Sequence, residues 1–285
     1  MEMLAVATLA THRAALRPEL SESPVQRSDE SGATERYFDL RRCVATQPSL
    51  DRSLHSGPIC QVVSEEQRMR IAVGFYGVHR STGLTAEGIQ KNMLEPLQKV
   101  GAIDVFVHSM LVAELENNAH TREAGVDLCQ EEYLLLRACT AGTVDQADVD
   151  RKYHLREIAE TAVYSVEESI GWRNLTGPFP RAKPPVIADE GVRLNILRSR
   201  YSMQRVARLM TTREVESGVS YTHIMLARPD VGILSPLVWK PPPPQSASMW
   251  LRVPNMQHYS GVNDRLAYGS RDALLYAANE VGSHD

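Results

Sequence analysis

The stretch that decides the fold is Arg70-Ile-Ala-Val-Gly-Phe-Tyr76, a short apolar run with β-branched residues that ends at Gly77. This pattern is typical of a buried strand. A second run of the same kind, Ile103-Asp-Val-Phe-Val-His108, follows a segment in which Ser81 or Thr82 can cap a helix. Strand, helix and strand in so short a stretch predict a βαβ unit. We therefore expect a parallel sheet, because neighbouring parallel strands need a crossover between them.

The helix between these strands carries Ile89, Met93 and Leu97 at intervals of four residues. That spacing places the three side chains on one face, which predicts that this face packs on the sheet. Pro96 is expected to end or bend the helix, because proline lacks the backbone N–H that a helix interior needs. Gly101 then breaks the chain before the second strand.

The chain beyond residue 190 continues the alternation of helices and strands. We expect a helix with an apolar stripe and arginines on its opposite face, then three strands, then a final helix capped by Ser270. The stripe consists of Val192, Ile196, Met203, Val206 and Met210, and the strands span 221–227, 249–253 and 265–268. Residues 131–139 and 151–168 have helical composition.

Residues 1–66 differ in character from the rest of the chain. The stretch 17–56 is rich in Ser, Pro, Arg and Glu and sustains no apolar period. Such a composition buries too little apolar surface to offset its conformational entropy. We expect a disordered N-terminal arm over 1–66 and one α/β domain over 67–285, a length that can bury its own core.

Charge and hydropathy exclude several classes of protein. Lys+Arg is 31 and Asp+Glu is 35, so the net charge of −4 argues against a protein that coats nucleic acid. No apolar run approaches the roughly 20 residues that span a bilayer, so no membrane span is expected. Glu2 stands where a signal peptide carries its basic region, which leaves a weak organelle transit sequence as the alternative to no leader. The default expectation is a cytoplasmic protein.

The four cysteines, Cys43, Cys60, Cys129 and Cys139, show neither CxxC spacing nor a histidine at zinc-finger distance. We interpret them as free thiols in a reducing compartment.

Polar residues follow three of the predicted strands. They are Gly77-Val-His-Arg80, His108-Ser109 and Arg228-Pro-Asp230. In an open α/β sheet ligands bind beyond the carboxyl ends of the parallel strands, so this arginine-containing set indicates an anionic ligand. The sequence has no GxGxxG, GxxxxGK[ST] or GxSxG motif, which counts against dinucleotide-binding, P-loop and hydrolase-elbow sites.

Each of these segments has a structural and a functional interpretation. Gly77 to Arg80 is either a turn with a solvated arginine or a loop in which Gly77 lets the backbone approach a ligand and Arg80 meets a phosphate or a base. Arg228 and Asp230 form either a structural ion pair or a site in which Asp230 holds a divalent ion against a diphosphate and Arg228 neutralises charge. His223 lies within a predicted strand and is interpreted as a core histidine.

A third polar cluster is Gly261-Val-Asn-Asp264-Arg265, with His258 shortly before it. Asn263, Asp264 and Arg265 are three consecutive hydrogen-bonding side chains in front of a predicted buried strand. They either satisfy one another, as in an Asx turn with Asp264 paired to Arg265, or they bind a ligand.

Taken together, these motifs resemble a poorly characterised group of glycosyltransferase-like proteins, similar to enzymes of the GT-A architecture that use nucleotide-activated sugars. The resemblance covers roughly residues 68–280. It rests on the order and spacing of Gly-Phe-Tyr-Gly (74–77) with Arg80, Asp-Val-Phe-Val-His (104–108), the run 195–202, Ala-Arg-Pro-Asp (227–230) and Gly-Val-Asn-Asp-Arg-Leu-Ala-Tyr-Gly-Ser (261–270).

The resemblance implies a Rossmann-like nucleotide-binding half with a mostly parallel sheet. In such enzymes an acidic motif, usually Asp-x-Asp, holds Mn²⁺ or Mg²⁺ and the sugar-nucleotide diphosphate. Arg228-Pro-Asp230 stands in that place, so Asp230 matches the motif as the metal ligand and Arg228 replaces its first acid. With Gly77 and Arg80 they form the implied nucleotide-sugar site.

The same resemblance makes Asp264 the candidate catalytic carboxylate and puts His258, Asn263 and Arg265 near the sugar and the acceptor. The members compared continue past residue 280, which implies that this chain lacks a C-terminal helical part. The expected function is transfer of a glycosyl group from a nucleoside-diphosphate sugar to an unknown acceptor. The alternative is a glycosyltransferase-like protein that binds its ligand without catalysis, since fold alone does not decide function.

Overall fold

The computed structural model describes residues 57–60, 69–112, 130–161, 190–240, 249–254 and 265–279. Most of the predicted arm over 1–66 lies outside these ranges. Residues 57–60 belong to the fold, because Ile59 is buried and pairs with Ala138.

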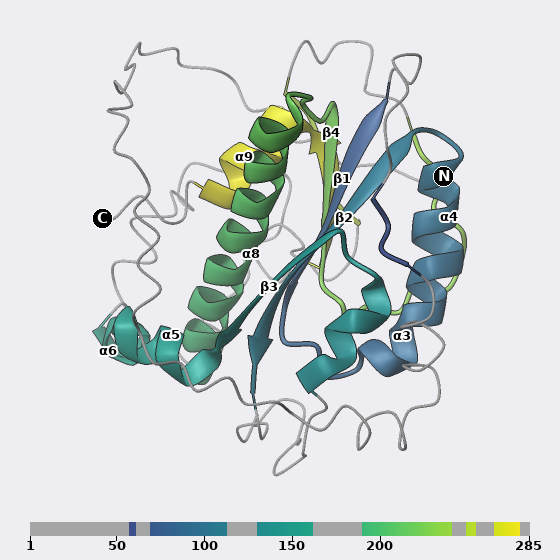
Figure 1. Cartoon of the computed structure of the whole chain (residues 1–285). Helices are drawn as coiled ribbons and strands as arrows, with labels where there is room; N and C mark the ends of the chain where they lie inside the picture. Colours follow the sequence, from purple (N-terminus) through teal and green to yellow (C-terminus); the bar gives the residue numbers. More distant parts are fainter. Residues whose placement is uncertain are drawn as a thin grey trace, which may run out of the picture.

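Six strands form one mixed sheet in the order β3-β2-β1-β4-β6-β5 (Figure 1). The strands β1 (Arg70–Gly77), β2 (Ala102–Leu111), β3 (Thr140–Asp145) and β4 (His223–Ala227) run parallel. The strands β6 (Leu266–Ser270) and β5 (Leu251–Arg252) are antiparallel to their neighbours. The predicted α/β class with flanking helices is confirmed, and the parallel part of the sheet consists of β3, β2, β1 and β4.

The crossover between β1 and β2 confirms the predicted βαβ unit. It consists of α3 (Thr82–Ile89), the π-helical turn η1 (Gln90–Leu94) and α4 (Glu95–Gln98). The predicted face is buried on the sheet at Ile89, Met93 and Leu97. Pro96 does not end the helix. The backbone stays helical through Leu94 and Glu95 into α4, and the π-helical turn η1 directly precedes the proline, as at other places where a helix accommodates a missing N–H.

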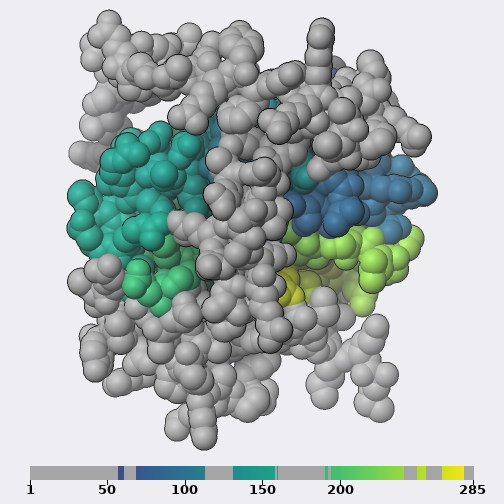
Figure 2. Space-filling view, turned by 90° about the horizontal axis from the view of Figure 1, so that it is seen from below, coloured from purple at the N-terminus to yellow at the C-terminus, as the bar shows by residue number. Residues whose placement is uncertain are grey.

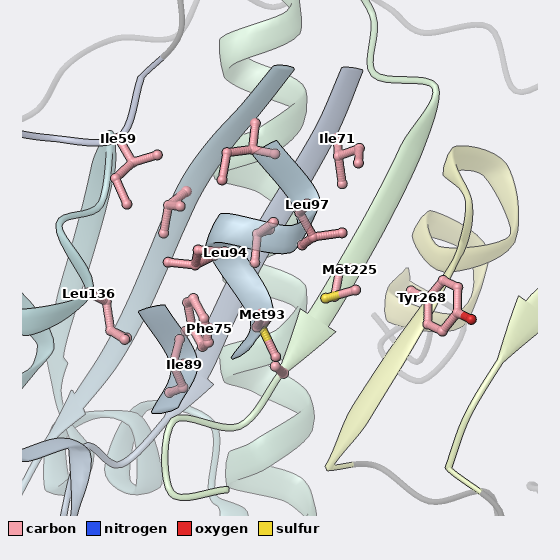
Figure 3. Close-up of a cluster of buried hydrophobic side chains, with 14 of the residues drawn as sticks. Ile59, Ile71, Phe75, Ile89, Met93, Leu94, Leu97, Leu136, Met225 and Tyr268 are labelled. Atoms are coloured by element: carbon pink, nitrogen blue, oxygen red, sulfur yellow. The ribbon is translucent and has the colours of Figure 1, made fainter. Parts of the chain in front are cut away.

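One face of the sheet forms a hydrophobic core with this crossover. Figure 3 shows Ile71 and Phe75 of β1 and Met225 of β4 facing Met93 and Leu97. β1 and β2 consist of nearly continuous apolar runs and are buried on both faces, as expected for strands in the middle of a parallel sheet.

The other face is covered by α8 (Glu190–Ser217) and α9 (Arg271–Asn279). Met203, Val206 and Met210 are buried as predicted. α8 approaches β1 closely at Gly74, where a Cβ would lie 2.5 Å from the Met210 Cε atom and 3.1 Å from the Val206 Cγ2 atom, so side chains of α8 would have to shift.

The predicted stripe on α8 is wrong toward its N-terminal end. Ile196 is 42% exposed, whereas Arg198, placed by the pattern on the solvent face, is buried. The Arg198 guanidinium forms an ion pair with Asp150 of the neighbouring helix α5 (Gln146–Lys152). Near its N-terminal end α8 therefore packs Arg198 against α5. This arginine is buried because Asp150, 48 positions earlier in the sequence, pairs with it.

The middle of the chain contains a strand that the sequence pattern did not predict. A 3-10 helix, η2 (Gln130–Leu136), occupies most of the predicted helical stretch 131–139. β3 follows with alternating half-buried and exposed residues, and then come α5 and α6 (Leu155–Thr161). β3 lies at the edge of the sheet and has no continuous apolar run, so its sequence, Thr-Ala-Gly-Thr-Val-Asp, does not resemble that of a buried strand.

The interpretation of all four cysteines as free thiols is wrong. Cys60 and Cys139 form a disulfide with a Cα–Cα distance of 5.0 Å. Their spacing of 79 residues gives no local signal. The pairing arises because residues 57–60 lie along β2, where the Val105 N–H donates to the Ile59 carbonyl over 3.1 Å. Since disulfides persist in oxidising surroundings, this bond also counts against the expected reducing compartment. Cys43 and Cys129 lie outside the described residues.

The antiparallel strands occupy two of the predicted stretches. β6 covers most of the predicted strand 265–268 and continues to Ser270, directly before α9. β5 is shorter than the predicted 249–253. Within the described ranges no helix has the length and apolar character needed to cross a membrane.

Candidate functional site

The carboxyl ends of the parallel strands meet at the lower end of the molecule in Figure 1, which Figure 2 views directly. The structure brings Gly77, Arg80, Arg228 and Asp230 to this edge. In Figure 2 the blue segment that contains α3 lies against the lime segment that follows Asp230. Asp264, Asn263 and His258 lie outside the described residues. Arg265 lies beside the site, and its carbonyl accepts a hydrogen bond from the Arg228 N–H over 2.9 Å.

The centre of this edge is an ion cluster in which two arginines share one carboxylate. Arg228 binds Asp230 in a bidentate manner, with Nε to Oδ1 at 2.9 Å and Nη2 to Oδ2 at 2.5 Å. Arg80 contributes Nη2 at 3.3 Å from the same Oδ2 atom. The Asp230 side chain is 11% exposed, while those of Arg80 and Arg228 are 25% and 32% exposed. The three side chains together carry one net positive charge.

The two arginines determine the ionisation of Asp230. Burial alone would raise the pKa of this carboxyl group, but the hydrogen bonds and charges of Arg228 and Arg80 outweigh burial and hold the pKa below its ordinary value. Asp230 is therefore a carboxylate at every pH near neutrality.

Hydrogen bonds between backbone and side chains hold the two arginine-bearing loops together. The Thr85 hydroxyl of α3 donates to the Pro229 carbonyl over 2.5 Å. Farther along the same crossover, the Asn92 amide donates to the Ile233 carbonyl over 2.7 Å. These contacts fix the loop after β4 against α3, so the distance between Arg80 and Arg228 is set by packed elements.

The N-terminus of α3 is occupied by a side chain of the protein itself. The Gly83 N–H donates to the Glu132 carboxylate over 3.0 Å, and Glu132, on η2, is buried. Ser81 occupies the N-cap position as predicted, but its side chain makes no capping hydrogen bond. A helix N-terminus attracts anions, and here an internal carboxylate fills that role.

The backbone conformation at position 77 favours glycine. Its φ of +105° lies in the region that glycine adopts without strain. Its N–H donates to the Ser202 hydroxyl of α8 over 2.8 Å. Ser202 also lies 2.8 Å from Nδ1 of His108, so it ties the ends of β1 and β2 to α8. The Gly77 N–H is therefore engaged inside the protein.

His79 is a residue of this edge that the sequence did not single out, although it lies inside the quoted Gly77-Val-His-Arg80. It is buried, and its Nδ1 atom lies 3.2 Å from the Thr82 hydroxyl. Its Nε2 atom is buried with no hydrogen-bond partner among the described residues. Burial lowers the pKa of His79 to about 3, although Asp230 acts in the opposite direction and His108 adds to the lowering. The imidazole is therefore neutral.

The donor set for a divalent cation is incomplete in this part of the chain. Within the described residues no group of three or more His, Cys, Asp or Glu side chains is arranged to hold a metal ion. Asp230 has both oxygens engaged by guanidinium groups, and the place of a first acid is taken by Arg228. The residues described at this edge do not fit Mn²⁺ or Mg²⁺, which require several oxygen ligands.

Neither protein-family models nor curated proteins give a match to this chain. The class of the molecule is therefore defined by its fold and by this edge. It is an α/β protein with a mixed six-stranded sheet and an arginine–aspartate cluster where its parallel strands end.

Proposed function

We propose that this protein binds a nucleoside-diphosphate sugar at the carboxyl edge of its sheet and transfers the glycosyl group to an acceptor hydroxyl. The proposal includes a GT-A-like organisation of the domain. The observation that carries it is the pair of partly exposed arginines, Arg80 and Arg228, joined by Asp230 where parallel strands end. Ligands of open α/β sheets bind at this position, and guanidinium groups match the oxygens of a diphosphate.

In this reaction the bond between the anomeric carbon and the diphosphate oxygen breaks, and a bond to the acceptor oxygen forms. The departing diphosphate gains negative charge, which Arg80 and Arg228 stabilise electrostatically. If the configuration inverts, a carboxylate takes the proton of the acceptor hydroxyl, and Asp264 is the candidate for that general base. His258, Asn263 and Arg265 are the candidates for contacts with the sugar and the acceptor.

The alternative is a protein of the same fold that binds the nucleotide sugar without transferring it. The engagement of Asp230 by two arginines favours this alternative, because an acid so bound does not act as the metal ligand of an Asp-x-Asp motif. The two functions share the binding site and differ in turnover.

The test is a thermal-shift screen of the full chain against UDP-, GDP- and CMP-sugars, followed by measurement of nucleotide release with a panel of acceptors. A ligand present at about 100 times its dissociation constant should add roughly 2.7 kcal/mol of stability. Stabilisation with acceptor-dependent release supports the transferase, and stabilisation without release supports the binding protein. If no sugar nucleotide stabilises the protein, the proposal is wrong.

A further inference from the structure

Asp230 has the contacts of a residue that holds arginines in place. Its Oδ1 atom accepts from Arg228 Nε, and its Oδ2 atom accepts from Nη2 of both Arg228 and Arg80. A divalent cation on these oxygens would stand beside two guanidinium charges and would have to displace their hydrogen bonds. The carboxylate is also largely buried, which limits the water and further oxygen ligands that such a cation needs.

The N-terminus of α3 does not provide a second anion-binding site at this edge. The N–H of Gly83 is bound by Glu132, so a diphosphate placed there would meet a buried carboxylate. The guanidinium groups of Arg80 and Arg228, by contrast, reach solvent. Planar guanidinium forks bind phosphate oxygens through paired hydrogen bonds, and their charge does not depend on pH near neutrality.

His79, buried near Asp230, is a further polar side chain at this edge. Its Nε2 atom is buried without a hydrogen-bond partner among the described residues, immediately before Arg80 in the chain. A buried polar atom left without a partner is rare in native proteins, and a water molecule, an ion or a ligand can satisfy it. A neutral imidazole can donate one hydrogen bond to an oxygen without adding charge to the site.

We infer that Arg80 and Arg228 bind the diphosphate of the ligand without a divalent cation, and that Asp230 is the positioning residue that aligns their guanidinium groups. This inference rests on the proposed function and specifies how its site recognises the ligand. The chain neutralises the diphosphate with its own fixed positive charges, and the lone acid after β4 serves the arginines.

The first experiment measures the affinity of the full chain for inorganic pyrophosphate, and for the nucleoside diphosphate of any donor found in the screen, by calorimetry in EDTA and in Mn²⁺. We expect dissociation constants that agree within about threefold between the two conditions. Arg80→Gln and Arg228→Gln should each weaken binding in EDTA about tenfold or more. Arg151→Gln is the matched control, since Arg151 is an exposed arginine of α5 paired with Asp148, and it should leave the affinity unchanged.

The second experiment tests the positioning role of Asp230 by a double-mutant cycle. Asp230→Asn should weaken binding in EDTA several-fold in the wild-type background. It should have a smaller further effect in the Arg228→Gln background, where only its contact with Arg80 remains, and almost none when both arginines are replaced. A purely structural residue would change the melting temperature and leave the affinity of the folded protein the same in both backgrounds.

The outcomes separate the inference from the proposed function. Binding that requires Mn²⁺, and that Asp230→Asn abolishes, overturns the inference and leaves the proposed function intact. Equal losses of affinity from Asp230→Asn in both backgrounds overturn the positioning role. If neither pyrophosphate nor any sugar nucleotide binds in either condition, the proposed function fails and the inference fails with it.

Discussion

Two ion clusters lie at opposite ends of the same strands, and they differ in exposure and in charge balance. At the amino end, Arg70 and Asp104 pair over 3.1 Å with side chains 5% and 2% exposed. The Tyr221 hydroxyl donates to Asp104 over 2.7 Å, and the Arg70 guanidinium lies over the Tyr221 ring at 4.7 Å. At the carboxyl end, the cluster of Arg80, Arg228 and Asp230 is open to solvent on its arginine side.

The comparison shows that the same residue types lie in different surroundings in the two clusters. The amino-end cluster matches one arginine to one carboxylate and joins β1, β2 and the start of β4 inside the protein. Burial of Tyr221 and the hydrogen bond from its hydroxyl to Asp104 raise the pKa of this residue well above the ordinary value, so the phenol keeps its proton. The carboxyl-end cluster has one more cation than anion among its three members. The Arg70–Asp104 pair is therefore enclosed by the protein, whereas the arginines of the carboxyl-end cluster are partly exposed, as the proposed binding site requires.

The largest expected effect is at the buried cluster. Asp104→Asn removes the charge that faces the Arg70 guanidinium and leaves that cation in a buried position. The free energy of unfolding should fall by about 3–5 kcal/mol. Chemical denaturation of the variant measures it. Tyr221→Phe, which removes only one hydrogen bond to Asp104, should cost about 1 kcal/mol and serves as the control. Equal costs for the two variants would show that the charge pair is not the main contributor.

Acidification should lower the stability of the folded protein, because His79 and His108 at the carboxyl end of the sheet are neutral in the folded state. Burial lowers the pKa of His79 to about 3 and that of His108 to about 4, with Arg205 adding to the lowering at His108. Both histidines take up protons in the unfolded chain at an ordinary pKa of 6.5, so their contribution is complete above pH 6.5 and declines as the pH falls below it. Between about pH 8 and pH 5 each should cost about 2 kcal/mol of stability.

Denaturation curves across this range test the effect. His79→Gln and His108→Gln should each remove about half of the histidine contribution to the slope of stability against pH. A slope unchanged in both variants would show that other groups cause the acid sensitivity.

Asp230→Asn should have a smaller effect on stability than Asp104→Asn, because both arginines around Asp230 reach solvent. We expect a loss of about 1–2 kcal/mol, measured by the denaturant midpoint. A loss as large as that of Asp104→Asn would remove the distinction between the two clusters. It would make Asp230 a purely structural partner of Arg228.

The smallest expected change in stability is that of Arg80→Gln. Arg80 is partly exposed and lies 3.3 Å from Asp230, longer than the contacts between Arg228 and Asp230, so the free energy of unfolding should change by about 1 kcal/mol or less. Anion affinity should nevertheless fall, as measured by pyrophosphate titration. A stable variant with undiminished affinity would show that Arg80 belongs to the surface and not to the site.

Several parts of the fold could be predicted from local patterns. The apolar runs of β1 and β2 and the spacing of Ile89, Met93 and Leu97 predicted the βαβ unit and the face of its helix. Polar residues after predicted strands also led to Arg80, Arg228 and Asp230. The strands and the helix could be predicted because their periods are apparent in neighbouring residues. The common location of Arg80, Arg228 and Asp230 could be predicted because parallel strands end at one edge, and their role in binding stays a prediction.

Other features depend on partners that are distant in the sequence. β3 has no apolar run, and only its pairing with β2 makes it a strand. The Cys60–Cys139 bond, Glu132 at the start of α3 and the burial of Arg198 each need a partner that other elements bring close. The sequence by itself therefore indicated most strands of the sheet and the edge at which Arg80, Arg228 and Asp230 lie. Only the tertiary structure decided that Asp230 is held by two arginines, because the energy of a carboxylate depends on the charges and solvent around it.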